Sequence, residues 1–337
     1  MHSPTPLICP EHAVPLTTPH APSEPYRCPS GCAFPVVGGI PRFVPQNNYA
    51  DSFGLQWNAF RRTQLDSYTG TTISRDRLAR IAGGSLDVFH GKDVLEAGCG
   101  AGRFTEIMLA AGARLFAADI SSAVAANHAN CGAAESYFVC QADIACLPIA
   151  PAQFDVVVCI GVIQHTPDPE RTMAALCSYV RPGGLLLIDH YPPNYPITPL
   201  RRFLRAFLLR HSSHYSLRFC TRLVNVLWPV HRWFWRVFRD SPLKRVPLLP
   251  KIQSLFVRIS PVVDYQDAYP ELGPQLLRTW ALLDTHDTLT DVYKHLRSRE
   301  QIEAHLLRCG MQQIETALAG NGIEARARKP ERAQRGG

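Results

Sequence analysis

The feature that most constrains the fold is a series of short apolar segments that alternate with helical patterns between residues 91 and 192. The segment 154–161 (FDVVVCIG) is apolar at nearly every position, which is typical of a strand covered on both faces. Strands that alternate with helices at this spacing predict crossover connections and a parallel sheet. The predicted strands are 93–97, 115–119, 136–142, 154–161 and 184–189, and the predicted helices are 104–111, 122–131 and 170–180. We therefore expect an α/β domain of the Rossmann-like type, with helices on both faces of its sheet.

The turn after the first predicted strand is rich in glycine. Gly98, Gly100 and Gly102 occupy alternate positions in VLEAGCGAGRFT. Glycines between a strand and a helix let the backbone turn tightly and approach a ligand closely, which indicates a nucleotide-like cofactor. The spacing G-x-G-x-G differs from the G-x-G-x-x-G of dinucleotide sites, and Glu96 would repel a pyrophosphate. These features disfavour a nicotinamide oxidoreductase and favour a ligand that carries a cationic amine and a sulfonium.

Two further acids end the next two predicted strands. Asp119 lies 21 residues after Gly98, where Rossmann-type sites use a carboxylate to hold ribose hydroxyls. Asp143 ends the third strand and is placed to meet an adenine amino group. Each acid alone is equally consistent with a solvated strand end, but all three acids at the right strand ends favour a cofactor site.

Together these segments resemble the class I S-adenosylmethionine-dependent methyltransferases, in particular the subgroup that includes the ubiquinone and menaquinone biosynthesis methyltransferases. EAGCGAGR resembles their first motif, AADIS the second, and the segment 142–189 the next three. The resemblance implies a seven-stranded, mostly parallel sheet whose last strand, near 322–328, is antiparallel. It also implies S-adenosylmethionine as the methyl donor and a small-molecule, glycan or lipid-linked acceptor.

The resemblance also assigns residues to the parts of the cofactor. These residues lie at predicted strand ends: Glu96, Ala97, Gly98, Cys99, Gly100, Gly102, Asp119, Ile120, Asp143, Ile144 and Gly161. The stretch 96–102 would face the methionine part, 119–120 the ribose and adenine, and 143–144 the adenine edge. Gly161 would lie on the methyl-donor side.

The general base for a hydroxyl acceptor is sought just past the fourth and fifth strands. Methyl transfer needs alignment of the acceptor, exclusion of water and, for a hydroxyl, removal of a proton. His165 and His190 follow these strands, at the edge where parallel sheets bind ligands. We predict His165 as the base because it follows Gly161 closely. The alternative is that His165 caps the next helix or packs against the loop.

Residues 1–48 hold four metal-ligand side chains in two clusters, Cys9-Pro-Glu-His12 and Cys28-Pro-Ser-Gly-Cys32. Thiolates and imidazole in tetrahedral geometry suit Zn²⁺, and a zinc ion can fold a segment too small for its own core. The segment resembles the small zinc-ribbon family related to the activator subunit of tRNA and protein methyltransferases. It departs from the usual paired C-x-x-C, so a ribbon without metal is the alternative. Four protein ligands would make the zinc structural.

The segments on either side of the core also carry patterns. Residues 49–90 predict a helical lead-in, in which Phe53 and Trp57 either cover the cofactor pocket or pack a helix on the sheet edge. Residues 297–329 predict a helix at 299–308 and strands at 311–318 and 322–328, joined by a hairpin turn at Asn321-Gly322. The polar tail 330–337 is expected to be disordered.

Residues 193–296 form a basic and aromatic insert. The chain has a net charge of +7, but the span 201–258 contains 13 Lys or Arg and one acid, so this span is +12 and the rest is −5. Apolar residues at i, i+3, i+4 and i+7 predict amphipathic helices at 200–208 and 230–238. These helices would pack together as a lid over the acceptor site or rest on an anionic membrane surface. Nucleic acid is the least favoured partner.

The composition also bears on location. No run of 18 apolar residues occurs, and MHSPTPLICPEH lacks the basic start and apolar run of a secretory signal. The 11 scattered cysteines, an odd number, argue for a reducing compartment. We therefore expect a cytoplasmic methyltransferase, peripheral at the inner membrane surface if the insert binds lipid. A non-catalytic partner that kept the cofactor pocket and docks proteins or RNA is the alternative.

Overall fold

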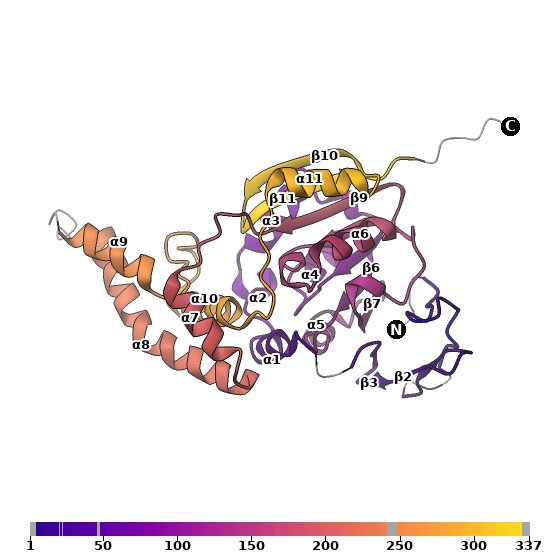
Figure 1. Ribbon diagram of the computed structural model, residues 1–337, viewed down its shortest axis with the longest axis horizontal. Helices are drawn as coiled ribbons and strands as arrows, with labels where there is room; N and C mark the ends of the chain where they lie inside the picture. Colours follow the sequence, from indigo (N-terminus) through magenta and orange to yellow (C-terminus); the bar gives the residue numbers. More distant parts are fainter. Residues whose placement is uncertain (1–4, 20, 22, 46–47, 241–247, 332–337) are drawn as a thin grey trace. The chain divides into compact units, whose positions relative to one another are not determined.

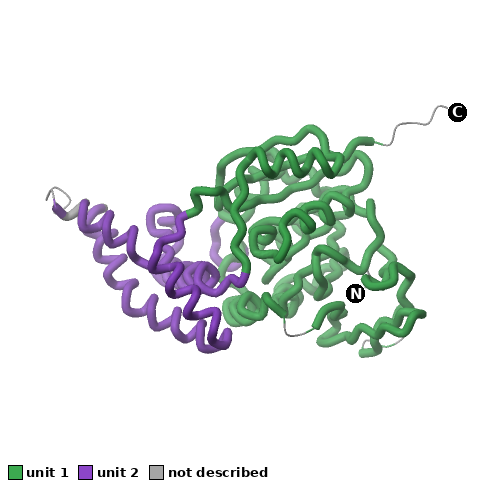
Figure 2. Tube along the Cα trace, in the orientation of Figure 1, with its two compact units in different colours: residues 1–66, 72–195, 293–337 green, residues 67–71, 196–292 purple. Residues whose placement is uncertain are grey.

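The computed structural model describes residues 5–19, 21, 23–45, 48–240 and 248–331 (Figure 1). The chain divides into two compact units (Figure 2). Unit 1 comprises residues 1–66, 72–195 and 293–337, and unit 2 comprises residues 67–71 and 196–292. The predicted tail 330–337 lies outside the described residues from position 332 onward.

Unit 1 is built on a seven-stranded sheet with the order β10-β11-β9-β8-β5-β6-β7 (Figure 1). Its strands are β5 (Asp93–Ala97), β6 (Arg114–Asp119), β7 (Tyr137–Gln141), β8 (Phe154–Cys159), β9 (Val180–His190), β10 (Gln312–Ala319) and β11 (Gly322–Arg328). Strands β5 to β9 pair in parallel, whereas β11 runs antiparallel to both β9 and β10. The predicted Rossmann-like sheet with an antiparallel last strand is therefore confirmed.

Helices pack on both sides of this sheet because its strands are apolar on both sides. They are α3 (Ile73–Ile81), α4 (Thr105–Ala110), α5 (Val124–Cys131), α6 (Pro169–Tyr179) and α11 (Arg299–Arg308). Val94 and Leu115 belong to the apolar cluster that includes residues of α3, α4 and α5. Their chain neighbours Leu95 and Phe116 belong to the cluster that includes residues of α6 and α11. Successive strand residues point to opposite faces, and this alternation separates the two clusters.

The turn between the last two strands differs from the prediction by one residue. Ala319 pairs with Gly322, so the two turn residues are Gly320 and Asn321 rather than Asn321 and Gly322. Gly320 has a φ of 54°, and a positive φ at the first turn residue is what tight hairpins need. Gly322 begins β11, where a Cβ would lie 2.4 Å from the carbonyl oxygen of His190. Both glycines are therefore required, for different reasons.

The N-terminal segment contains two short antiparallel strand pairs, β1 (Tyr26–Arg27) with β2 (Ala33–Phe34) and β3 (Val36–Val37) with β4 (Ile40–Pro41). It runs along β7, the edge strand of the sheet, where the Phe43 amide donates to the Gln141 carbonyl at 2.7 Å. Phe34 and Phe43 join the same apolar cluster as Phe138 of β7. This segment covers an edge whose backbone groups would otherwise lack partners. The lead-in helices α1 (Asp51–Ala59) and α2 (Asp66–Thr69) follow it.

Unit 2 contains four long helices among its described residues, α7 (Pro199–Leu208), α8 (Ser213–Asp240), α9 (Leu249–Ile259) and α10 (Pro274–Thr290). The helices predicted at 200–208 and 230–238 correspond to α7 and to the last part of α8, and α10 packs against both. Both predicted stripes are only partly right: on α7, Leu208 is buried, but Leu200 and Phe203 are 41% and 69% exposed. Phe234 and Val237 are buried, but Val230 and Trp233 are exposed, because the neighbouring helices cover one side of the expected face. None of the described helices combines the length and apolar character that a membrane span requires.

Candidate functional site

The glycine turn lies at the carboxyl end of β5. Gly98, Gly100 and Gly102 have φ values of 83°, 48° and 100°, in the left-handed region that favours glycine. A Cβ on Gly98 would lie 2.3 Å from Val162, so this part of the turn is closely packed. At Gly100 the nearest neighbour among the described residues, the indole of Trp57, would be 3.8 Å from a Cβ, and at Gly161 no described atom would lie within 4 Å. The backbone therefore leaves room for a ligand at Gly100 and Gly161.

Glu96 ends a chain of buried hydrogen bonds. The Thr105 hydroxyl donates to the Glu96 carboxyl at 2.5 Å, and the Asn127 amide donates to Thr105 at 2.9 Å. The Tyr137 hydroxyl donates to Asn127 at 2.6 Å. Burial raises the pKa of Glu96 to about 8, opposed by the Thr105 hydrogen bond and reinforced by the charge of Asp119. A cation bound near the buried Glu96 carboxyl would stabilise its charged form and so lower its pKa.

Asp119 and Asp143 follow the next two strands at the same edge. The Asp119 carboxyl accepts hydrogen bonds from the Ser121 amide and hydroxyl, at 2.8 and 2.7 Å, and from the Gly100 amide at 2.9 Å. Burial nevertheless raises its pKa. Asp143 caps a short 3-10 helix (Ile144–Cys146) by accepting from the Ala145 amide at 2.9 Å. Asp119 is thereby tied directly to the glycine turn.

The lead-in segment contacts the same edge of the sheet. The Asn48 amide donates to the Ile120 carbonyl at 2.8 Å, and the Asn58 amide donates to the Ser122 carbonyl at 3.1 Å. Burial raises the pKa of the Tyr49 hydroxyl, and the charges of Asp143 and Asp119 raise it further. Together with the Trp57 indole beside Gly100, these contacts set α1 across the carboxyl ends of β5 and β6.

His165 lies in a short 3-10 helix (Ile163–His165) and is 7% exposed. Its Nδ1 lies 3.2 Å from the Tyr293 carbonyl, and its ring centroid lies 5.4 Å from those of both Phe53 and Tyr191. A carbonyl can only accept, so Nδ1 carries the proton in this contact. The next helix is capped by Asp168, which accepts from the Arg171 amide, and not by His165.

Two further buried polar groups near these positions, Asp189 and Gln164, were not anticipated, and His190, the other candidate base, lies in the same strand as Asp189. Asp189 of β9 accepts from the Gly161 amide and from Arg77 of α3, both at 2.5 Å, which ties α3 to the Gly161 turn. Gln164 is 1% exposed, and its amide has no hydrogen-bond partner among the described residues. Burial lowers the pKa of His190 to about 4, so its ring is neutral near pH 7. The position of Asp189 at the end of an apolar strand was the one available signal.

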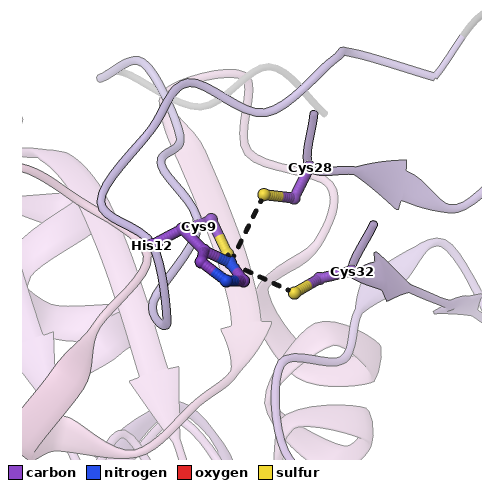
Figure 3. A group of neighbouring side chains, drawn as sticks. All are labelled: Cys9, His12, Cys28 and Cys32. Atoms are coloured by element: carbon purple, nitrogen blue, oxygen red, sulfur yellow. Dashed lines mark hydrogen bonds between the residues drawn. The ribbon is translucent and has the colours of Figure 1, made fainter. Parts of the chain in front are cut away.

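The four predicted metal ligands come together in the N-terminal segment (Figure 3). Their ligand atoms all lie within 4.8 Å of one another. The Nδ1 atom of His12 lies 3.5 Å from the sulfur of Cys9, 3.6 Å from that of Cys28 and 3.4 Å from that of Cys32. One imidazole nitrogen cannot hydrogen-bond three thiols at once. Tetrahedral Zn²⁺ with Zn–S near 2.3 Å and Zn–N near 2.05 Å would set such N–S distances at about 3.6 Å, so the residues fit a zinc ion.

Comparison with known proteins agrees with the fold and the motifs. Residues 95–188 match the family described as "Methyltransferase domain". The ubiquinone biosynthesis O-methyltransferase of Coxiella burnetii is 33% identical over 108 residues, which are 31% of this chain and 46% of that protein. The enzyme of the same name from Aromatoleum aromaticum is 37% identical over 109 residues, again 31% and 46% of the two chains. The chain thus spans about half the length of the curated relatives it matches.

Similarity among solved structures is broader but weaker. The magnesium protoporphyrin IX methyltransferase from Synechocystis PCC 6803 with bound S-adenosylhomocysteine shares 16% identity and covers 83% of this chain and 96% of its own, with a TM-score of 0.41. The segment 95–188 is similar to a methyltransferase domain, and its strands belong to a sheet of the Rossmann-like type. The resemblance read from the sequence motifs is confirmed for this segment.

Proposed function

We propose that this protein transfers a methyl group from S-adenosylmethionine to a small-molecule acceptor. The observation that carries the proposal is the set of three acids, Glu96, Asp119 and Asp143, at the carboxyl ends of β5, β6 and β7. They surround a glycine turn that leaves room at Gly100, within the segment that matches a methyltransferase domain. The buried, raised-pKa Glu96 suits a cationic ligand and not a pyrophosphate.

The cofactor contacts follow from this placement. The stretch 96–102 is proposed to hold the methionine part, including Glu96, Ala97, Gly98, Cys99, Gly100 and Gly102. Asp119 and Ile120 are proposed to hold the ribose and adenine. Asp143 and Ile144 are proposed to meet the adenine edge, and Gly161 the methyl-donor side. Tyr49 and Trp57, from the lead-in, are proposed to cover this pocket. The charge of Asp119 acts on the Tyr49 hydroxyl, and the Trp57 indole lies beside Gly100.

The chemistry asked of the protein is modest, because S-adenosylmethionine supplies a methyl group already activated by its sulfonium. His165 is proposed as the general base for a hydroxyl acceptor. Its neutral imidazole would take the hydroxyl proton while the acceptor oxygen forms its bond to the methyl carbon and the old bonding pair stays on sulfur. The rings of Phe53 and Tyr191 beside it would keep water out. The buried Gln164 amide would give the acceptor a further polar contact.

The zinc site is proposed to be structural. Cys9, His12, Cys28 and Cys32 would fill all four positions of a tetrahedral ion, so no position remains for a substrate. The ion would hold together a segment whose own strands are only two residues long. It supplies folding energy and no chemistry.

A glycan or lipid-linked acceptor is further proposed, because the basic insert suits contact with an anionic membrane surface. The alternative is a non-catalytic partner that binds the cofactor and docks proteins or RNA. Transfer of a labelled methyl group from S-adenosylmethionine to a compound in pooled small-molecule or lipid extracts would support the enzyme. Tight cofactor binding without transfer to any such pool would support the alternative.

The direct experiment is calorimetric titration of the zinc-replete protein with S-adenosylmethionine and S-adenosylhomocysteine, with NADH as a control. We expect micromolar binding of the first two and none of NADH. Asp119→Ala should weaken binding about 10- to 100-fold, because it removes charge-assisted hydrogen bonds to the ribose. Asp267→Ala, which removes an exposed carboxylate, is the matched control. Absence of binding to the folded wild type would refute the proposal.

A further inference from the structure

The buried His231 of α8, in unit 2, contacts the end of α9 and the loop that follows it. The His231 ring of α8 bridges the Asp264 carboxyl through Nδ1 and the Ser260 hydroxyl through Nε2, both at 2.8 Å. The rings of Phe234 and Phe256 add a contact with centroids 5.3 Å apart. Ser260 is 3% exposed, so its hydroxyl is not presented to solvent. Together with the His231–Phe256 ring contact, these interactions hold α8 against α9.

An apolar stripe on α9 is left exposed. Leu248, Ile252, Leu255 and Ile259 are separated by four, three and four residues, which places them on one face of the helix. They are 62%, 46%, 61% and 53% exposed. Lys251 and Arg258 lie next to this stripe on the helical wheel. In a helix that only packs against a protein core, this apolar face would be buried.

A second exposed stripe lies on α8. Val226, Val230 and Trp233 have the same helical spacing and are 70%, 38% and 51% exposed. Arg222 and Arg236 are exposed on neighbouring positions of the helix. Both helices thus present aliphatic or aromatic side chains bordered by basic ones. The amphipathic pattern is repeated on two helices that pack together.

The span 201–258, which includes α8 and most of α9, is strongly basic. Between residues 201 and 258 there are 13 Lys or Arg and one acid, Asp240. A partner that covers the two stripes must therefore be both negatively charged and able to receive aliphatic side chains.

We propose that α8 and α9 form an interfacial docking surface for anionic lipid. The basic side chains would meet headgroup phosphates while the apolar stripes enter the boundary between headgroups and acyl chains. The bases of single-stranded RNA stack on aromatic side chains, and an aliphatic stripe of Leu and Ile offers no such stacking surface. A second copy of this chain would bring another basic face and be repelled. Lipid binding by this surface does not depend on the proposed function. Its purpose does, because that purpose is to bring the enzyme to a lipid-linked acceptor.

The test is sedimentation with vesicles of phosphatidylcholine, with and without 30% phosphatidylglycerol as an approximate anionic fraction. We expect binding to the anionic vesicles at low salt, little binding to pure phosphatidylcholine, and weakening of binding as salt rises to about 0.5 M. Leu255→Ser with Ile259→Ser should lower the partition coefficient about tenfold or more. The matched control is Leu307→Ser with Leu318→Ser, which changes two leucines that are 61% and 68% exposed in unit 1.

Each result has a distinct meaning. Equal binding by the stripe variant and the wild type, or no binding of the wild type to anionic vesicles, would overturn the docking surface. Binding of single-stranded RNA that persists in the stripe variant would assign the basic face to nucleic acid instead. Calorimetric titration of the same preparations with S-adenosylmethionine reports the cofactor pocket separately, and circular dichroism shows that the variants are folded. Failure of the vesicle assay alone would leave the proposed function standing.

Discussion

Glu96 offers the sharpest test of the proposed cofactor site. Its pKa of about 8 means that the carboxyl is about nine-tenths protonated at pH 7 in the free protein. A bound ligand with a positive amine and sulfonium would draw the proton off. If the pKa of Glu96 in the complex falls to about 5 or lower, the affinity for S-adenosylmethionine rises about 50-fold between pH 6 and pH 8, from the ratio (1 + 10²)/(1 + 10⁰). Binding at pH 7 would release about 0.9 proton.

The assay is titration calorimetry at pH 6, 7 and 8 in buffers with different ionisation enthalpies. Glu96→Gln keeps the shape and the acceptor for the Thr105 hydroxyl but has no proton to lose, so its affinity should vary with pH only as the ligand's own groups titrate. S-adenosylhomocysteine, which lacks the sulfonium charge, should show a smaller pH dependence. A flat affinity for S-adenosylmethionine in the wild type, or the same slope in Glu96→Gln, would refute the reasoning.

The same shift predicts how stability depends on pH. The folded-state pKa of Glu96 lies above its unfolded value of 4.5, so between about pH 4.5 and 8 the folded protein binds more protons than the unfolded chain. The contribution of this group to the free energy of unfolding is therefore full below pH 4.5 and is lost as pH rises toward 8. Thermal melts of wild type and Glu96→Gln at pH 5 and pH 8 measure the difference. The variant should lose less stability over this interval.

Three further predictions concern other parts of the site. Cys28→Ser should lose the single zinc ion per chain, measured by atomic absorption, and lower the free energy of unfolding by about 3 kcal/mol or more, whereas the exposed Cys146→Ser should do neither. His165→Ala should lower turnover about 10²- to 10⁴-fold while the dissociation constant for S-adenosylmethionine stays within about threefold; unchanged turnover would remove His165 from the mechanism. Arg77→Met should cost about 3–5 kcal/mol in denaturant unfolding, because it leaves Asp189 charged and buried, whereas Arg75→Met on the exposed side of α3 should cost little.

The sheet could be predicted because its strands carry their own signal. The apolar run at 154–161 became β8, and the acids after β5, β6 and β7 arrived at one edge because parallel strands end there. The grouping of Cys9, His12, Cys28 and Cys32 could be predicted from residue type and spacing. The Gly320–Asn321 turn was missed by one residue because Asn-Gly is the commoner hairpin signal, while here the register of β11 against His190 decides.

The networks that tie distant segments together carry no comparable signal. Arg77 and Asp189 are 112 residues apart, and a buried ion pair of this kind is set by how α3 packs on the sheet. Burial along α8 could not be read from its pattern either. Phe234 is covered because Phe256 of α9 packs on it, whereas Trp233, one position away, is exposed. A helical period shows which residues share a face, but only the neighbouring helices decide which face is covered.

Gln141 of the edge strand β7 is one link between the N-terminal segment and the edge that is proposed to bind the cofactor. Arg42 donates to the Gln141 side-chain oxygen at 3.1 Å, and the Gln141 side-chain nitrogen donates to the Ile120 carbonyl at 2.9 Å. Asn48 donates to the same carbonyl at 2.8 Å. The carbonyl that follows Asp119 is thus held from two sides by groups that depend on the ribbon's position. Loss of zinc is therefore expected to weaken S-adenosylmethionine binding as well as stability, and Gln141→Leu should weaken binding while zinc content stays at one ion per chain. Unchanged affinity in both cases would mean that the ribbon only covers the edge of β7.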